Sequence, residues 1–245
     1  PYTTLFRFGR ASCRERVYVL RRSILFRGLP VESIRRLTTE AETGLVPCGH
    51  VFYRSGERID RLRLVLSGGV LIERDEPDGE LVCLEVCEAG RTYGDFAALL
   101  DRPTTHSARA AGVVRFMSLP VEPLRRQLAE DGESAVSIIA SAAAHARATA
   151  DHLVRLKAMS GVRRAGDLLL RLSRDNGGRV RFALPYEKSV LAHSIGLRPE
   201  SFSRALSQLA AVGVTFEGEF VRLSSQERLR AFVENRSWPH ASEAV

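Results

Sequence analysis

Residues 184–206 decide the fold of this chain, and they read LPYEKSVLAHSIGLRPESFSRAL. Residues 190–192 form the apolar face of a short helix, and Gly196 then allows a tight turn because glycine tolerates backbone angles that other residues avoid. Pro199 suits the first position of a second helix, where its missing N–H costs nothing. The stretch therefore predicts two short helices joined by a turn.

The second predicted helix has one apolar side and one polar side. Phe202, Ala205, Leu206 and Leu209 recur at helical spacing, so we expect them to be buried. The outer side and the N-terminal end then present polar side chains, namely Arg198, Glu200, Ser201, Ser203, Arg204 and Gln208. In helix-turn-helix proteins these are the positions that contact base edges in the major groove.

The segments on either side of these two helices complete a known supersecondary order. Residues 162–173 predict an amphipathic helix and residues 180–184 a strand, while two strand-like runs at 214–216 and 220–223 flank a Glu-Gly turn. A helix, a turn with glycine, a second helix and a two-stranded wing is the winged helix-turn-helix order. We assign this domain to residues 159–235 and expect a disordered tail over 236–245.

The first half of the chain predicts a domain of short strands. Glycines separate strand-like runs, and an amphipathic helix begins near Leu29, with another helix after Pro123. Many short strands at this spacing are typical of a β-sandwich or barrel-like roll, which we assign to residues 21–131. The runs are 51–53, 62–66, 70–72, 81–86 and 113–117.

Between the two domains the sequence predicts one long helix, over residues 132–158. Its apolar residues recur at about the spacing that is found where two helices pack along each other. The alanines among them would let two copies of the helix approach closely. The positions are Ile139, Ala142, Ala146, Ala150 and Leu153. We expect a dimerisation helix, and the alternative is a single helix lying on its own domain.

Residues 1–20 fit neither of the two predicted domains. Their apolar residues follow the helical and the strand period only briefly, so we expect a non-native or disordered segment. The alternative is a genuine basic arm. We leave this segment out of the functional interpretation.

Composition narrows the class of protein. With 44% hydrophobic and 27% charged residues the chain is typical of a globular protein, and no apolar stretch approaches the roughly 20 residues of a membrane span. We therefore expect a soluble cytoplasmic protein.

Residues 158–215 hold nine Lys or Arg against four Asp or Glu, which indicates an anionic partner. No phosphate loop, metal-ligand spacing or nucleophile–base set is present, so we do not expect an enzyme.

The motif Gly-Leu-Arg-Pro-Glu-Ser-Phe-Ser-Arg at 196–204 resembles the recognition helix of the CRP/FNR superfamily of bacterial transcription regulators, and the resemblance extends over about residues 24–233. It implies an α+β fold with an N-terminal β-roll (a cyclic-nucleotide-binding-like jelly roll), a dimerisation helix and a C-terminal winged helix-turn-helix. Arg204 would bond guanine, Glu200 would accept from cytosine, and Ser203 would touch a neighbouring base.

The resemblance also implies partners. A homodimer would bind double-stranded DNA at a palindrome with TTGAT-like arms one helical turn apart, and an activator would contact RNA polymerase. Four basic residues near the motif would bind phosphate, namely Arg179, Arg181, Lys188 and Arg198. One alternative is that the helix-turn-helix pattern is fortuitous. The other is an effector-binding module whose C-terminal domain contacts protein and not DNA.

The effector is the open question. The family's phosphate cassette has Gly-Glu-Leu and then an arginine about ten residues later, and here the matching positions are Gly94, Asp95, His106 and Ser107. Because a buried phosphate without its arginine loses a charge-assisted pair, we do not expect cyclic AMP. An iron–sulfur cluster is not expected either, since Cys13 is the sole cysteine near the N-terminus.

Residues 96–103, with the recognition helix, look most similar to the Dnr and HcpR-like branches, some of which sense nitric oxide through haem. The candidate axial ligands are His50, His106, His145 and His152. A solvated or structural role is the alternative for each of them. A cyclic-nucleotide-responsive regulator remains the other possibility for the sensor domain.

Overall fold

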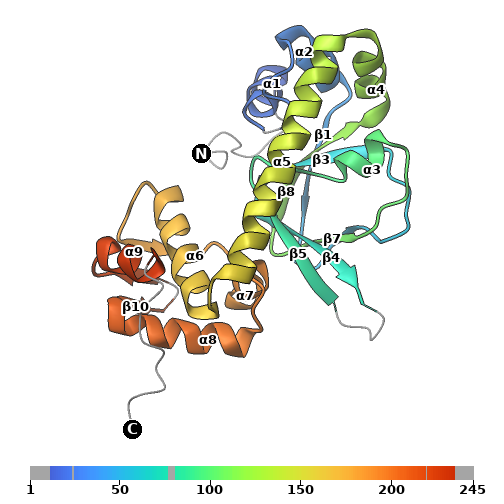
Figure 1. Ribbon diagram of the computed structural model, residues 1–245. Coiled ribbons are helices and arrows are strands. Elements are labelled where there is room, and N and C mark those ends of the chain that lie inside the picture. Colours follow the sequence, from blue (N-terminus) through green and yellow to red (C-terminus); the bar gives the residue numbers. More distant parts are fainter. Residues whose placement is uncertain (1–11, 24, 77–80, 219, 235–245) are drawn as a thin grey trace. The chain divides into compact units, whose positions relative to one another are not determined.

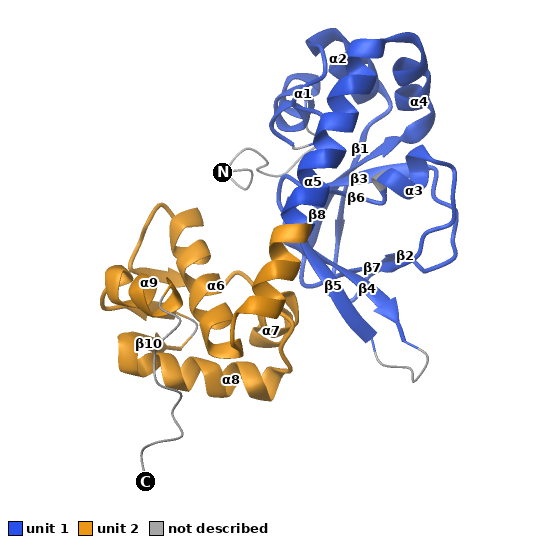
Figure 2. Ribbon diagram, in the orientation of Figure 1, with its two compact units in different colours: residues 1–149 blue, residues 150–245 orange. Residues whose placement is uncertain are grey.

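The computed structural model describes residues 12–23, 25–76, 81–218 and 220–234. It divides into two compact units, residues 1–149 and 150–245 (Figure 2). The division falls within helix α5 (Gly132–Ala158), which begins in the first unit and ends in the second. None of the helices within the described ranges has the length and apolar character that crossing a membrane requires.

The strands of unit 1 form two antiparallel four-stranded sheets, which confirms the predicted β-roll. One sheet has the order β1-β8-β3-β6, and the other has the order β2-β7-β4-β5. The strands of the first are β1 (Glu42–Val46), β8 (Val114–Pro120), β3 (Arg61–Ser67) and β6 (Thr92–Tyr93). Those of the second are β2 (Val51–Tyr53), β7 (Ser107–Ala110), β4 (Gly69–Asp75) and β5 (Leu81–Glu88).

Strand β3 separates two apolar clusters of unit 1. Because side chains alternate along a strand, Leu62, Leu64 and Leu66 face one side and Val65 the other. The three leucines pack with residues of the helices, and Val65 packs with Val70 of the second sheet. The helices are α1 (Cys13–Arg22), α2 (Val31–Thr39), α3 (Asp95–Leu99) and α4 (Val121–Glu130), and α1, α2 and α4 gather with the start of α5 at one end of the unit (Figure 1).

Helix α1 corrects the expectation of disorder for the part of residues 1–20 that the structure describes, which begins at Ser12. Ser12 caps its N-terminus and Glu15 completes the capping box, a reciprocal pair of bonds that stabilises a first turn. Val19 and Leu20 are fully buried in the cluster under α2, and Arg16 donates to the carbonyl of Ala41 at 2.7 Å. The second half of the segment therefore belongs to the folded unit, whereas residues 1–11 lie outside the described residues.

Unit 2 has the predicted winged helix-turn-helix order around one apolar core. Its elements are α6 (Gly161–Asp175), β9 (Arg181–Ala183), α7 (Lys188–Ser194), α8 (Pro199–Gln208), the 3-10 turn η2 (Leu209–Val212), β10 (Val214–Glu217), β11 (Phe220–Leu223) and α9 (Gln226–Glu234). Strand β9 pairs with β11, so the wing is part of a three-stranded sheet. Helix α9 was not predicted; it buries Leu229, Phe232 and Val233 against the same core.

Candidate nucleic-acid interface and ligand cavity

The turn between α7 and α8 fixes the direction in which α8 begins. Gly196 has a φ of +65°, in the left-handed region that favours glycine. Its N–H donates to the carbonyl of His193, and the next N–H, of Leu197, donates to Ala192, both at 3.0 Å. These two bonds form the motif that commonly ends a helix at a glycine. The predicted role of Gly196 is therefore confirmed.

Helix α8 has the two faces that the sequence predicts. Phe202 is fully buried, and Ala205, Leu206 and the following Leu209 are buried with it. On the outer side Glu200, Ser203, Arg204 and Gln208 are exposed, and Ser201 is half-buried. The apolar face thus holds the helix on the core of unit 2 and leaves a continuous polar edge uncovered.

Contacts within the protein leave the polar edge of α8 available for a partner. Arg204 donates to the Ser201 hydroxyl at 3.3 Å, a local bond on the surface. In the described part of the chain neither Glu200 nor Arg204 forms an ion pair. Arginine and glutamate in this state keep the donors and acceptors that base edges match.

The four basic residues near the motif differ in how much of their charge is available. Arg181 pairs with Glu217 of the wing at 3.2 Å and lies over the Phe220 ring at 4.2 Å. Lys188, at the start of α7, is exposed, with its ammonium 5.0 Å from the centre of the Phe216 ring. Arg179 and Arg198 are exposed as well. These three are the better candidates for phosphate contacts, because the charge of Arg181 is already offset.

Unit 1 contains a cavity of about 290 Å³ beside the start of α3. Two of the four predicted effector residues, Gly94 and His106, line it. Ser107 is not among the lining residues, and its hydroxyl instead accepts from the Ser55 N–H at 3.0 Å. For Asp95 the structure places the backbone at the first position of α3 and does not describe the side chain.

The polar groups of this cavity come mainly from residues that sequence analysis did not single out. Arg91, in the turn after β5, bonds Glu85 at 2.5 Å through Nη1 and the Nδ1 atom of His145 at 2.9 Å through Nη2. Tyr93 lines the same cavity, and within the described residues its buried hydroxyl has no hydrogen-bond partner. Burial raises the pKa of Tyr93, so the hydroxyl is a neutral donor.

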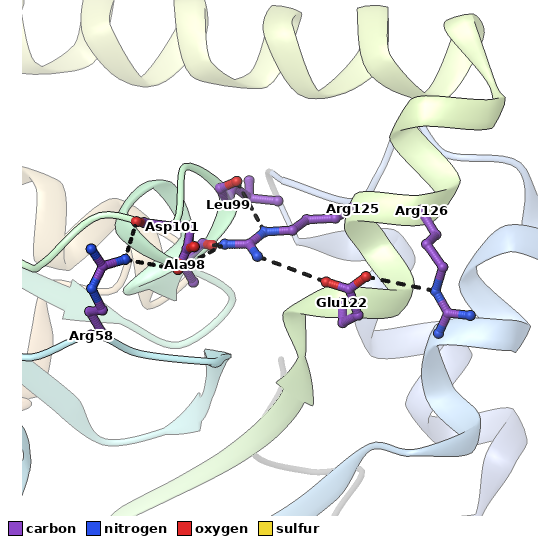
Figure 3. A network of polar contacts seen from close by, with 7 residues as sticks. All are labelled: Arg58, Ala98, Leu99, Asp101, Glu122, Arg125 and Arg126. Atoms are coloured by element: carbon purple, nitrogen blue, oxygen red, sulfur yellow. Dashed lines mark hydrogen bonds and ion pairs between the residues drawn. The ribbon is translucent and has the colours of Figure 1, made fainter.

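A polar network holds the segment that follows Gly94 in place (Figure 3). Arg125 of α4 donates to the carbonyls of Ala98 and, at 3.2 Å, Leu99, which are among the last of α3. Asp101, whose φ of +53° is unusual for a residue other than glycine, pairs with Arg58 at 3.2 Å. Cations at helix carbonyls stabilise the end of a helix, so the network fixes one wall of the cavity.

Two of the four histidines proposed as haem ligands line the cavity, and the other two lie elsewhere. His106 and His145 both line the cavity. His106 bonds the Tyr53 hydroxyl at 3.2 Å through Nε2, and His145 is engaged by Arg91 through Nδ1. His50 packs against Phe52 outside the cavity, and His152 lies in unit 2.

Helix α5 has one face packed on unit 1 and another face that is exposed. Ser134, Ile138 and Ser141 are buried against unit 1, with the Ser141 hydroxyl donating to the carbonyl of Leu25 at 3.3 Å. The predicted seam is turned away from this contact: Ile139, Ala146, Ala150 and Leu153 are exposed, and Ala142 is half-buried. Val136 and Val154 are exposed too. One face of α5 packs on its own unit, and another presents uncovered apolar side chains.

Two family models match the chain, one in each unit. Residues 45–131 match the cyclic nucleotide-binding domain, and residues 163–232 match the Crp-like helix-turn-helix domain. The first lies within the two sheets and α4, and the second runs from α6 to α9. The order of the two domains is that of the predicted fold.

Similar proteins are known that cover most of the chain. The CRP-like cAMP-activated global transcriptional regulator of Mycobacterium tuberculosis is 29% identical over 216 residues, which are 86% of this chain and 96% of that protein. A proposed cAMP-binding regulatory protein from Silicibacter pomeroyi DSS-3 is 29% identical, with a TM-score of 0.67 over 90% of this chain and 99% of that one.

FixK2 from Bradyrhizobium japonicum, 23% identical, has a TM-score of 0.68 over 78% of this chain and 96% of its own, and shares the fold. The two domain matches, in this order, agree with the relatives that span both units. This chain belongs to the CRP/FNR superfamily of transcription regulators.

Proposed function

We propose that the protein is a homodimeric, sequence-specific DNA-binding regulator that reads a palindrome through α8. The observation that carries the proposal is the exposed polar edge of α8 opposite the fully buried Phe202. Arg204 makes a bidentate contact to guanine, Glu200 accepts from a cytosine amino group, and Ser203 touches a neighbouring base. Ser201 and Gln208 lie beside them and contact the same groove.

The arms of the palindrome are TTGAT-like, as the resemblance of residues 196–204 implies. Lys188, Arg198 and Arg179 neutralise phosphates on either side of the groove and set the register of α8. Contacts of this kind add affinity on any sequence, so discrimination between sequences rests on the polar edge alone.

Dimerisation through α5 gives the site its symmetry. Ile139 is 67% exposed and Leu153 50% exposed, which leaves apolar area that a second copy of the helix would cover. Ala142, Ala146 and Ala150 lie between them, and their small side chains favour close approach of two helices. Two copies of α8 then lie one helical turn apart on the DNA.

The cavity of unit 1 is the effector site, and a small ligand there biases the dimer between two DNA-binding states. Such control requires the ligand to bind the two states with different affinity. The relative from M. tuberculosis is activated by cAMP, which favours a cyclic nucleotide. When the protein activates transcription, RNA polymerase is the further partner.

A haem-based nitric oxide signal is the second candidate, because His106 and His145 line one cavity. Haem ligation by either residue would produce a Soret band after reconstitution with hemin. Replacing that residue by alanine would abolish the band, and His50→Ala, outside the cavity, is the control. A protein with no Soret band contradicts the haem signal and leaves DNA binding unaffected.

Selection of genomic fragments by the purified protein tests the proposed function. We expect enrichment of a two-fold symmetric sequence with TTGAT-like arms. Binding that is indifferent to sequence, or a helix-turn-helix domain that binds protein and not DNA, would contradict it. Because selection needs no known target gene, activators and repressors are tested alike.

A further inference from the structure

We infer that Arg91 is the anion-binding residue of the unit 1 cavity and that the ligand is a compact organic monoanion. The inference rests on the proposed function in one respect, namely that this cavity is the effector site. The resemblance implies a phosphate cassette with an arginine about ten residues after its glutamate, and the matching segment holds Thr105 and His106 at that place. Arg91 lines the same cavity from the turn after β5.

The charged side chains that the structure describes at the cavity favour a ligand of charge minus one. Among the lining residues whose side chains the structure describes, Arg27 and Arg91 contribute two positive charges and Glu85 one negative charge, with the histidines counted as neutral. One surplus cation in a partly enclosed site favours a single negative charge, because a buried ion is stable only when it is paired. A dianion would remain partly uncompensated.

The size and the apolar wall of the cavity favour an organic ligand over a bare inorganic ion. A volume of about 290 Å³ accommodates a small organic molecule. Ile72, Phe96 and Ala144 supply apolar wall, which packs against an organic ligand and not against a bare ion.

Glu85 competes with the ligand for Arg91. The guanidinium of Arg91 is held by the Glu85 carboxylate at 2.5 Å and by His145 of α5 at 2.9 Å. The Glu85 carboxylate already offsets the charge of this guanidinium, so it lowers the attraction that Arg91 exerts on a ligand oxyanion. Removing Arg91 and removing Glu85 must therefore have opposite effects on anion affinity.

Calorimetric titration of the full chain tests this with three monoanions and their uncharged counterparts. The pairs are cyclic AMP with adenosine, cyclic GMP with guanosine, and salicylate with salicylamide. For the best-bound pair, Arg91→Gln should lower the ratio of anion affinity to neutral affinity about 10- to 100-fold, the value of a charge-assisted hydrogen bond. Glu85→Gln should raise the same ratio, because the competing carboxylate is gone.

Arg74→Gln is the matched control, since Arg74 lies in the same unit, pairs with Glu76 at the surface and does not line the cavity. It should leave the ratio unchanged. A protein that misfolds loses the anion and its neutral counterpart together, so the ratio separates folding from charge recognition.

Three results overturn the inference: a wild-type protein that binds none of the three anions, an Arg91→Gln variant with an unchanged ratio, or a Glu85→Gln variant whose ratio falls. DNA binding by the ligand-free protein is measured alongside. Sequence-specific DNA binding in the presence of any of these results would leave the proposed function standing without this ligand assignment.

Discussion

Phe202 and Arg204 lie two residues apart on α8, yet Phe202 is fully buried in the core of unit 2 and Arg204 is exposed. Two residues turn a helix by about 200°, which puts the two side chains on opposite faces. The same short helix therefore separates a residue that holds the fold from one that we propose contacts DNA.

This separation predicts different effects on stability. Phe202→Ala should lower the free energy of unfolding of unit 2 by about 3–5 kcal/mol, because it removes a large buried ring and leaves a cavity. Arg204→Ala should change it by about 0.5 kcal/mol or less, as exposed substitutions usually do. Thermal denaturation followed by circular dichroism compares the two variants; similar losses from both would show that Arg204 is a structural residue.

Gly196 predicts a second effect on stability. A β-carbon at this position would lie 2.9 Å from Cδ2 of Leu156, and the backbone is left-handed. Gly196→Ala should cost about 1–2 kcal/mol for the backbone angle, and more for the contact. Gly177→Ala is the control, with a φ of +73° and no atom within 4 Å of the new β-carbon. Equal melting temperatures for the two variants would show that the Leu156 side chain moves aside at little cost.

The cysteines predict two classes of thiol reactivity. Burial, followed by the charge of Glu73, raises the pKa of Cys83 to about 11, so at pH 8 only about one thiol in a thousand is the reactive thiolate. Cys87 is buried, whereas Cys13 and Cys48 are exposed. Titration with Ellman's reagent should show two fast and two slow thiols, and the rate at Cys83 should rise as the pH approaches 11. A single rate for all four would contradict this.

The exposed face of α5 predicts the oligomeric state. Ile139→Glu should weaken self-association about 30-fold or more, because it places a charge within an apolar seam. Val113→Glu, which changes an equally exposed apolar residue outside α5, should not affect it. Sedimentation equilibrium measures both. A dimer that tolerates Ile139→Glu would place the interface elsewhere.

How far the sequence predicts this molecule depends on how local each signal is. The two faces of α8 and the turn at Gly196 follow from spacing within ten residues, and the structure confirms both. Strand β7 could not be predicted, because Ser107–Ala110 consists mainly of small residues and becomes a strand by pairing with β2 and β4 on its two sides. Helix α9 carries a signal in the helical spacing of Leu229, Phe232 and Val233, so it is within reach of prediction from sequence.

The cavity shows the same limit for the candidate site. Gly94 and His106 were found through their resemblance to a cassette, and both line it. Arg91 meets His145 across 54 positions of sequence, so no local pattern connects the two residues. Long-range side-chain contacts of this kind become visible only when the fold brings a turn and a helix together.

Fluorescence anisotropy with the selected DNA site and its one-base variants tests the central claim most directly, through Arg204→Ala and Arg179→Ala. Arg204→Ala should cost about 1–3 kcal/mol on the intact site and remove discrimination at one guanine in each arm. Arg179→Ala should weaken binding equally on every sequence. It should also reduce the slope of log affinity against log salt concentration by about the amount that one phosphate contact contributes. If Arg204→Ala instead weakens binding equally on every sequence, α8 does not read bases through Arg204 and the account is wrong.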